Sequence, residues 1–200
     1  MIKNIVFDLG NVIIRWNPDH IVSQYEQDEQ MQKQLIAGLF GSLHWQNFDH
    51  GTILREDLIT HVQQVFTKEY HDTIHDMIHH WHKYAPPITG MEQLVKDLKA
   101  QGYKIYLLSN TNIHFDEYKD TIPALQHFDG YYISAQRKLV KPDPAIYHDF
   151  LQTFDLIAEE CLFIDDLKAN VESAISVGID GYHFDGNVDD LRKYIGSVKA

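Results

Sequence analysis

The stretch CLFIDDLKANVESAISVGIDGYHF (residues 161–184) decides the fold, because it contains one complete strand–helix–strand unit. The apolar run CLFID predicts a buried strand, KANVESAISVG predicts a helix that ends at Gly178, and GYHF predicts a last strand. A strand, a helix and a second strand in direct succession are typical of a mostly parallel sheet with helices on both faces.

The same alternation extends outward from this unit. A first strand is expected at residues 2–9, and from Pro86 onward helices and strands alternate again. YKIYLLS (residues 103–109) and YYIS (residues 131–134) predict buried strands. PDPAIYHDFLQTF (residues 142–154) predicts a helix with Asp143 as its cap. The fold class predicted is α/β, with a Rossmann-like, mostly parallel sheet.

The segment between the first strand and Pro86 has a different character. It contains long polar helical patterns, and almost nothing in it alternates with the period of a strand. We therefore predict an α/β core formed by residues 1–15 and 86–200, and a helical cap formed by residues 16–85 that lies over the core as a lid.

Composition disfavours two classes of partner. The chain has 200 residues, 44% of them hydrophobic, and 17 basic against 29 acidic side chains give a net charge of −12. This balance disfavours nucleic acid and anionic membranes, which need a basic surface.

The single cysteine, Cys161, cannot form an internal disulfide, and MIKNIVF lacks the pattern of a signal peptide. A cytoplasmic protein with a small-molecule partner is expected; the oligomeric state is not indicated.

Polar side chains follow the predicted strands at the point where each strand ends. In open α/β sheets, ligands bind at the carboxyl ends of the strands, so these side chains are expected to meet. They are Asp8, Ser109 with Asn110, the pair Asp165–Asp166, and Lys138 or Lys141 in the loop after YYIS.

This set of groups suits phosphoryl chemistry. The carboxylates of Asp8 and Asp166 are hard oxygen ligands of the kind that Mg²⁺ prefers. A carboxylate such as Asp8 can also attack phosphorus and form an aspartyl-phosphate. A lysine ammonium and the hydroxyl of Ser109 can hold phosphoryl oxygens and neutralise developing charge.

Four motifs carry a resemblance to a known family. FDLGN, LLSNTN, KPDPAIY and FIDDLKANVESA resemble the motifs of the haloacid dehalogenase-like (HAD) hydrolases, over essentially the whole chain. The DLGNV form, the DD pair and the short cap are similar to the branch that contains α-glucose-1-phosphate phosphatases and the N-terminal phosphatase domain of soluble epoxide hydrolases. The resemblance implies a Mg²⁺-dependent phosphatase acting on a small phosphorylated metabolite.

The resemblance also implies a role for each matching residue. Asp8 would be the nucleophile and a Mg²⁺ ligand, and Asp166 and the main-chain carbonyl of Gly10 would complete the protein's metal ligands. Ser109 and Asn110 would bind the phosphoryl group, and Asp165 and Asn170 would support the site. Lys141 would neutralise the phosphoryl group; it is preferred to Lys138 because it directly precedes a proline, as the motif requires.

Gly10 departs from the pattern of most phosphatases in this family, which have a second aspartate there as general acid and base. Glycine keeps the carbonyl but cannot move a proton, and such help is worth ~10²–10⁴ in rate. Either another group or water does this, or the leaving group needs little help. The second case would favour a sugar phosphate such as a sugar 1-phosphate, whose leaving oxygen is more acidic.

Two other functions are compatible with the sequence. Haloacid dehalogenases also lack the second aspartate, but they need no metal and no acidic pair, so Asp165–Asp166 favours the phosphatase. A non-catalytic binding protein that kept the fold is the second alternative.

The cap offers further candidates without a unique interpretation. His71, His75 and His79 lie at i, i+4 and i+8 and predict either a metal site or, as we favour, a solvated face beside the buried stripe of Ile74, Ile78, Trp81 and Tyr84. Two more groups of cap residues either belong to the cap's own structure or touch substrate. The first group is His44, Trp45, Phe48, Asp49 and His50. The second group lies near the hinge between core and cap and is Trp16, Asn17, Asp19 and His20.

Overall fold

Five parallel strands form the centre of the computed structural model, which describes residues 1–198. Their order is β3-β2-β1-β4-β5, so β1 lies in the middle and each neighbouring pair is parallel. The strands are β1 (Asn4–Phe7), β2 (Lys104–Ser109), β3 (Gly130–Ile133), β4 (Cys161–Asp165) and β5 (Asp180–His183). The α/β fold class is thereby confirmed, and β1 is shorter than the strand expected at residues 2–9.

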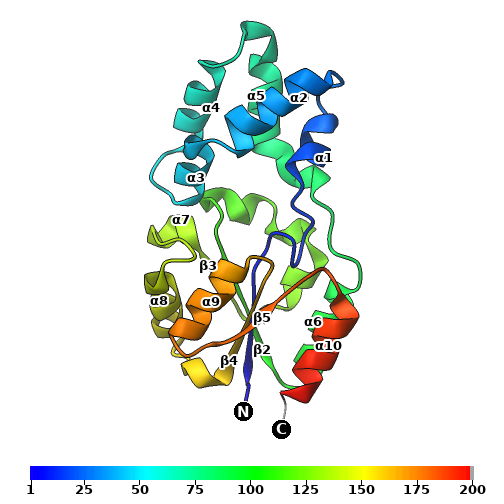
Figure 1. Cartoon of the computed structure of the whole chain (residues 1–200), viewed down its shortest axis with the longest axis vertical. Coiled ribbons are helices and arrows are strands. Elements are labelled where there is room, and N and C mark those ends of the chain that lie inside the picture. Colours follow the sequence, from blue (N-terminus) through cyan, green and yellow to red (C-terminus); the bar gives the residue numbers. More distant parts are fainter. Residues whose placement is uncertain (199–200) are drawn as a thin grey trace.

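Alternating side chains of the strands enter two separate apolar clusters, one on each face of the sheet. On one face Leu162 and Ile164 pack with α6 (Met91–Ala100) and α10 (Val188–Ser197). On the other face Phe163 packs with α8 (Pro144–Phe154) and α9 (Lys168–Ser176). Figure 1 shows these two helix pairs on opposite sides of the sheet. A strand buried on both faces explains why CLFI is apolar throughout.

Local signals placed most of these helices correctly. The carboxylate of Asp143 accepts the main-chain N–H of Ala145 at 2.9 Å and caps α8, as predicted. Gly178, which follows α9, has φ +91, a conformation that favours glycine at a helix end. The sequence did not predict α10, nor the single turn α7 (Ser134–Arg137) directly after β3.

Helices alone make up the segment between β1 and the next unit of the core. They lie beyond the carboxyl ends of the strands, as Figure 1 shows, so the predicted helical cap after the first strand is confirmed. These helices are α1 (Pro18–Ser23), α2 (Glu29–Leu35), a π turn (Ile36–Phe40), α3 (Leu43–Asp49), α4 (Arg55–Gln63) and α5 (His71–His80). The same segment contains two shorter 3₁₀ turns, Lys68–Tyr70 and Trp81–Tyr84. The 3₁₀ turns that follow residue 86 are Ile113–Glu117, Lys119–Thr121, Pro123–His127 and Ala158–Glu160.

The apolar cluster that contains Ile5 and Phe7 of β1 continues into the cap as far as Trp45 and Trp81. Cap and core therefore pack through a common apolar interior. The exact boundaries of the two parts, at residues 15–16 and 85–86, stay a prediction.

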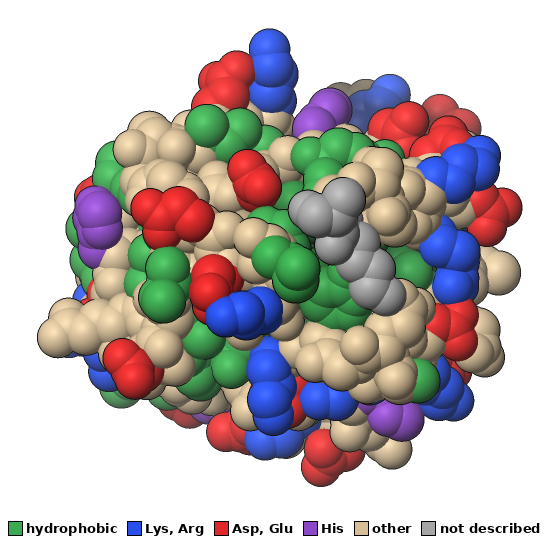
Figure 2. All heavy atoms as spheres, turned by 90° about the horizontal axis from the view of Figure 1, so that it is seen from below, with side chains coloured by type: hydrophobic (Ala, Val, Ile, Leu, Met, Phe, Trp, Pro, Cys, Tyr) green, Lys and Arg blue, Asp and Glu red, His purple; other side chains and the backbone are tan. Residues whose placement is uncertain are grey.

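The face at the amino ends of the strands lies opposite the cap. Figure 2 shows acidic and basic side chains interspersed on this face, around scattered hydrophobic ones. Among residues 1–198, no helix has both the length and the apolar character needed to cross a membrane.

Candidate active site

The polar strand ends meet in one cavity of about 300 Å³ between the sheet and the cap. Asp8 follows β1 directly, and Ser109 is the last residue of β2. Both line the cavity with five more predicted residues: Gly10, Asn110, Lys141, Asp166 and Asn170. Lys138 is exposed and lies outside the lining, so of the two candidate lysines it is Lys141 that faces the cavity.

Lys141 is buried between two carboxylates. Its Nζ donates to Oδ1 of Asp8 and to Oδ2 of Asp165, each at 2.7 Å, and the lysine side chain is 2% exposed. Burial alone would lower the pKa of Lys141, but the two carboxylates outweigh burial and leave the pKa raised. Burial also raises the pKa of Asp8, and the attraction of Lys141 offsets that effect only in part.

Asp165 is saturated with hydrogen bonds. Its Oδ1 accepts the main-chain N–H of Leu167 at 2.8 Å, and the amide of Asn170 donates to both carboxylate oxygens at 3.0 Å. With Lys141 on Oδ2, this fully buried carboxylate has no direction left for another ligand. Asp165 and Asn170 therefore lie where supporting residues would, holding Lys141 in place.

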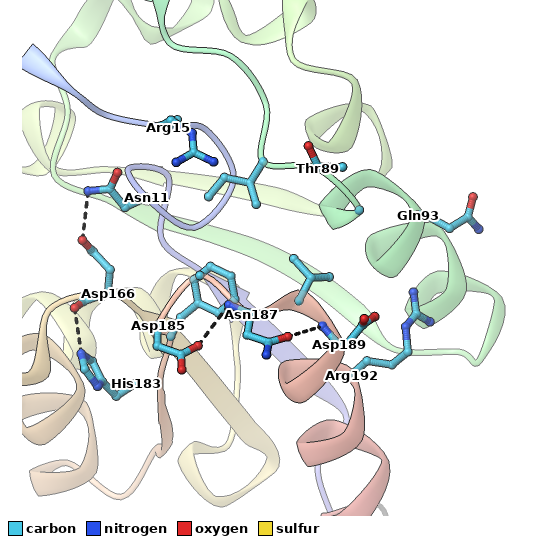
Figure 3. Close-up of a pocket in the computed structure, with 15 residues that line it drawn as sticks. Asn11, Arg15, Thr89, Gln93, Asp166, His183, Asp185, Asn187, Asp189 and Arg192 are labelled. Carbon is cyan, nitrogen blue, oxygen red and sulfur yellow. Dashed lines mark hydrogen bonds between the residues drawn. The ribbon is translucent and has the colours of Figure 1, made fainter. Parts of the chain in front are cut away.

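Asp166 is held from two sides, and both contacts are visible in Figure 3. Its Oδ2 accepts the side-chain N–H of Asn11 at 3.1 Å, and the ring of His183 at the end of β5 lies 2.9 Å from its main-chain oxygen. Half-burial raises the pKa of Asp166. Neither Asn11 nor His183 was predicted from the sequence. Asn11 left one signal: asparagine tolerates the left-handed conformation that its φ of 54 shows here.

The donor set fits a hard divalent cation. Oxygen atoms of Asp8, Asp165 and Asp166 lie within 4.8 Å of one another. Three carboxylates against the one ammonium of Lys141 leave two uncompensated negative charges, which a divalent cation would balance. Since Asp165 is saturated, Asp8 and Asp166 are the carboxylates that would hold it.

The side chain of Asn110 holds the loop that contains Lys141. Its amide donates to the main-chain oxygen of Lys141 and accepts the main-chain N–H of Lys141, both at 2.9 Å. These two bonds fix the loop that delivers Lys141 to Asp8. Phosphoryl binding by Asn110 stays a prediction.

Four aromatic side chains form the cap side of the cavity, and we call them the aromatic wall: Trp16, Phe40, Trp45 and Trp81. They contact one another, with ring centroids 4.9 Å apart for Trp16–Trp81 and 4.7 Å for Phe40–Trp45. Of the hinge candidates, only Trp16 lines the cavity. The others, Asn17, Asp19 and His20, are exposed.

The cap candidates from His44 to His50 also differ in whether they line the cavity. Asp49 and Trp45 line the cavity, whereas Phe48 belongs to the cap core. His44 stacks on His61 with centroids 4.2 Å apart, and the ring of His50 lies 2.9 Å from the main-chain oxygen of Lys138.

Gly10 is not required by its backbone conformation. A Cβ atom there would lie 3.5 Å from Cβ of Trp16, which is an ordinary contact. The indole of Trp16 thus lies beside position 10, where most phosphatases of the HAD-like family have their second aspartate.

The histidines of α5 make local contacts. His71 Nε2 lies 2.9 Å from the main-chain oxygen of Gln63, and His75 stacks on His79 at 4.2 Å. Within residues 1–198, the cluster of Asp8, Asp165 and Asp166 is the group whose geometry suits a metal, and the histidines form none. The predicted buried stripe holds for Ile74, Ile78 and Trp81, while Tyr84 is half-buried.

A larger groove of about 1000 Å³ lies on the other side of Asp166. Arg15, Asp185 and Arg192 line it (Figure 3), and it shares Asn11 and Asp166 with the first cavity. Asp166 therefore borders both the cavity and the groove.

Comparisons with known proteins show what the chain is similar to. A family model described as haloacid dehalogenase-like hydrolase matches residues 2–178. A sesquiterpene phosphatase of Aspergillus oryzae is 28% identical over 198 residues, covering 97% of each chain. D-ribitol-5-phosphate phosphatase of Bacteroides thetaiotaomicron is 25% identical over 203 residues, covering 94% of this chain and 95% of the relative.

Solved structures share the fold over nearly the whole chain. One of them is a HAD family enzyme of Bacteroides thetaiotaomicron in complex with magnesium and inorganic phosphate. It matches with a TM-score of 0.77 at 24% identity and covers 96% of this chain and 99% of its own.

Proposed function

The chain belongs to the haloacid dehalogenase-like hydrolases and is a phosphatase of that family, and on this premise we propose that it hydrolyses a small phosphorylated metabolite with Mg²⁺, through an aspartyl-phosphate on Asp8. The observation that carries the proposal is the contact of Lys141 with Asp8 inside a cavity that Ser109 and Asp166 also line.

Each side chain has a task in this reaction. Asp8, fixed at the end of the central strand, attacks phosphorus, since its place in the sheet leaves it little freedom. Lys141 neutralises the charge that develops on the phosphoryl oxygens, and the hydroxyl of Ser109 holds one of them. Asp8 and Asp166, with the carbonyl of Gly10, would hold Mg²⁺, which when bound screens the negative charge of the phosphate from the nucleophile.

For the substrate, a sugar phosphate such as a sugar 1-phosphate is the finer proposal. A cavity of about 300 Å³ suits a small ligand, and the aromatic wall can pack against the C–H face of a sugar ring. The same wall supports a second candidate, an ester with an apolar leaving group. The name of the Aspergillus oryzae relative, a sesquiterpene phosphatase, points in that direction.

The test is phosphate release from three esters with and without Mg²⁺: a hexose 1-phosphate, the matching 6-phosphate and an isoprenyl phosphate. We expect release that needs Mg²⁺ and that Asp8→Asn abolishes, with the preferred ester identifying the leaving-group class. Release of halide from a 2-haloacid, with no activity on any ester, would favour the dehalogenase instead. Wild-type turnover by Asp8→Asn would contradict the covalent mechanism.

A cytoplasmic location completes the proposal. It is supported by Cys161, a buried free cysteine that needs no oxidising compartment.

A further inference from the structure

Asp49, the last residue of α3, brings a carboxyl group from the cap into the cavity of Asp8. The same cavity is lined by Gly10, where the resembling phosphatases have their acid. Asp49 is the titratable group that the cap contributes to the lining of this cavity.

Three contacts clamp the Asp49 segment onto the core. The buried hydroxyl of Ser134 donates to the main-chain oxygen of Asp49 at 2.6 Å and accepts the main-chain N–H of Thr111 at 2.9 Å. The ring of His50 lies 2.9 Å from the main-chain oxygen of Lys138. Gly51, at φ +74, approaches Ala135 so closely that a Cβ would lie 2.2 Å from its carbonyl oxygen. The position of Asp49 relative to the loop that follows β2 is thus fixed by direct contacts.

The environment of the Asp49 side chain favours its protonated form. Burial raises its pKa to about 7, although hydrogen bonds from Asn112 and Trp45 pull the other way. A nearby titratable group is the phenol of Tyr118, whose pKa the charge of Asp49 helps to raise. A carboxyl group with a pKa near neutrality can both give and take a proton at the pH of a cell.

We propose that Asp49 is the general acid and base of this enzyme and supplies from the cap the proton transfer that Gly10 cannot. This inference rests on the proposed phosphatase function. It adds a catalytic residue that no motif of the sequence marks.

The proton balance closes over two steps. In the first, Asp8 forms a bond to phosphorus, the bond from phosphorus to the leaving oxygen breaks, and that oxygen takes the proton of Asp49 to become an alcohol. In the second, water attacks phosphorus, the carboxylate of Asp49 takes a proton from the water, and the bond between Asp8 and phosphorus breaks. Inorganic phosphate leaves, and both aspartates return to their starting states.

A proton donor in the cavity changes the expectation for substrates. Without a donor, only esters with acidic alcohols would react well, which was the reason to favour a sugar 1-phosphate over its 6-phosphate isomer. With Asp49 as donor, a sugar 1-phosphate remains a substrate, but the enzyme gains access to alkyl phosphates as well.

The test compares Asp49→Asn with the wild type on an alkyl phosphate and on p-nitrophenyl phosphate, whose leaving group needs no proton. We expect kcat/KM for the alkyl ester to fall by ~10²–10⁴, with a much smaller loss for the aryl ester. The aryl ester should also give a burst of nitrophenol, because the second step loses its base. Asp72→Asn, an exposed carboxylate on α5, is the matched control and should leave both rates unchanged.

Equal losses on both esters, or no loss on either, would overturn the role of Asp49. If Asp49→Asn folds poorly, the leaving-group dependence of the wild type decides: a shallow slope supports a donor, and a steep slope overturns it. Asp8→Asn separates the two proposals, since the phosphatase mechanism fails only if that variant keeps its activity or the wild type has none.

Discussion

The ammonium group of Lys141 lies 2.7 Å from the carboxylate of Asp8, although 133 positions separate them in the chain. The contact links the carboxyl end of β1 to the loop before α8. It joins Asp8, the proposed nucleophile, to the ammonium group that would neutralise the phosphate. Several properties of the site depend on this contact and on the bonds that support it.

Replacing Lys141 should destabilise the protein as well as inactivate it. In Lys141→Met, the carboxylates of Asp8 and Asp165 lose their common partner while buried, which costs about 3–5 kcal/mol. Denaturant unfolding without Mg²⁺ measures this loss. Lys138→Met, at the exposed lysine three positions earlier, is the control and should change the free energy of unfolding by less than about 0.5 kcal/mol. Equal effects of the two substitutions would contradict the special position of Lys141.

Asp166→Asn should weaken Mg²⁺ binding. The substitution removes one of the two carboxylates that have room for a cation, while the amide keeps the size of the side chain. Titration calorimetry with Mg²⁺ measures the effect. Asp189→Asn, an exposed carboxylate that lines the neighbouring groove, is the control and should leave the affinity unchanged. Unaltered affinity in Asp166→Asn would remove this residue from the metal site.

Two substitutions of Asn11 separate its conformation from its hydrogen bond. Asn11→Gly keeps the left-handed φ of 54 but loses the bond to Asp166 and the bond that Asn11 accepts from the main-chain N–H of Trp16, so we expect weaker Mg²⁺ binding and a small fall in melting temperature. Asn11→Ala loses the same bonds and also strains the left-handed conformation, so it should unfold more readily by a further ~1 kcal/mol. Calorimetry and thermal unfolding distinguish the two effects. Normal Mg²⁺ affinity in both variants would mean that Asn11 does not orient Asp166.

The stability of the protein should report the protonation of Asp49. Its pKa rises from 3.8 to about 7 on folding, so the folded state binds more protons between these values. Its contribution to stability is complete below about pH 4 and is lost as the pH rises toward 7. Asp49→Asn removes that loss. The free energy of unfolding of the variant, relative to the wild type, should therefore increase from about pH 4 to about pH 7.

Metal-free chemical denaturation at several pH values measures this difference. Asp8, whose pKa is raised in the same direction, is present in both proteins and cancels in the comparison. Asp72→Asn should give a difference that does not vary with pH. A flat difference for Asp49→Asn would show that this carboxyl group titrates at its ordinary pKa.

The sequence by itself determined the sheet, most of the core helices and the meeting of the strand ends. Runs such as CLFID show which residues are buried, and Asp143 and Gly178 mark helix ends, because these signals act between close neighbours in the chain. Parallel strands present their carboxyl ends to one ligand site, and this rule alone is enough to bring Asp8, Ser109 and Asp166 together.

Only the tertiary structure decided what each polar group faces. In the pair Asp165–Asp166, the carboxylate of Asp165 is saturated by hydrogen bonds from Lys141, Leu167 and Asn170. Asp166 instead lines both the cavity and the neighbouring groove. Asp49 turns into the cavity while its neighbour His50 bonds the core loop. A local pattern reports whether a side chain is buried, but its partners come from distant parts of the chain. The roles of these residues therefore arise only when cap and core pack together.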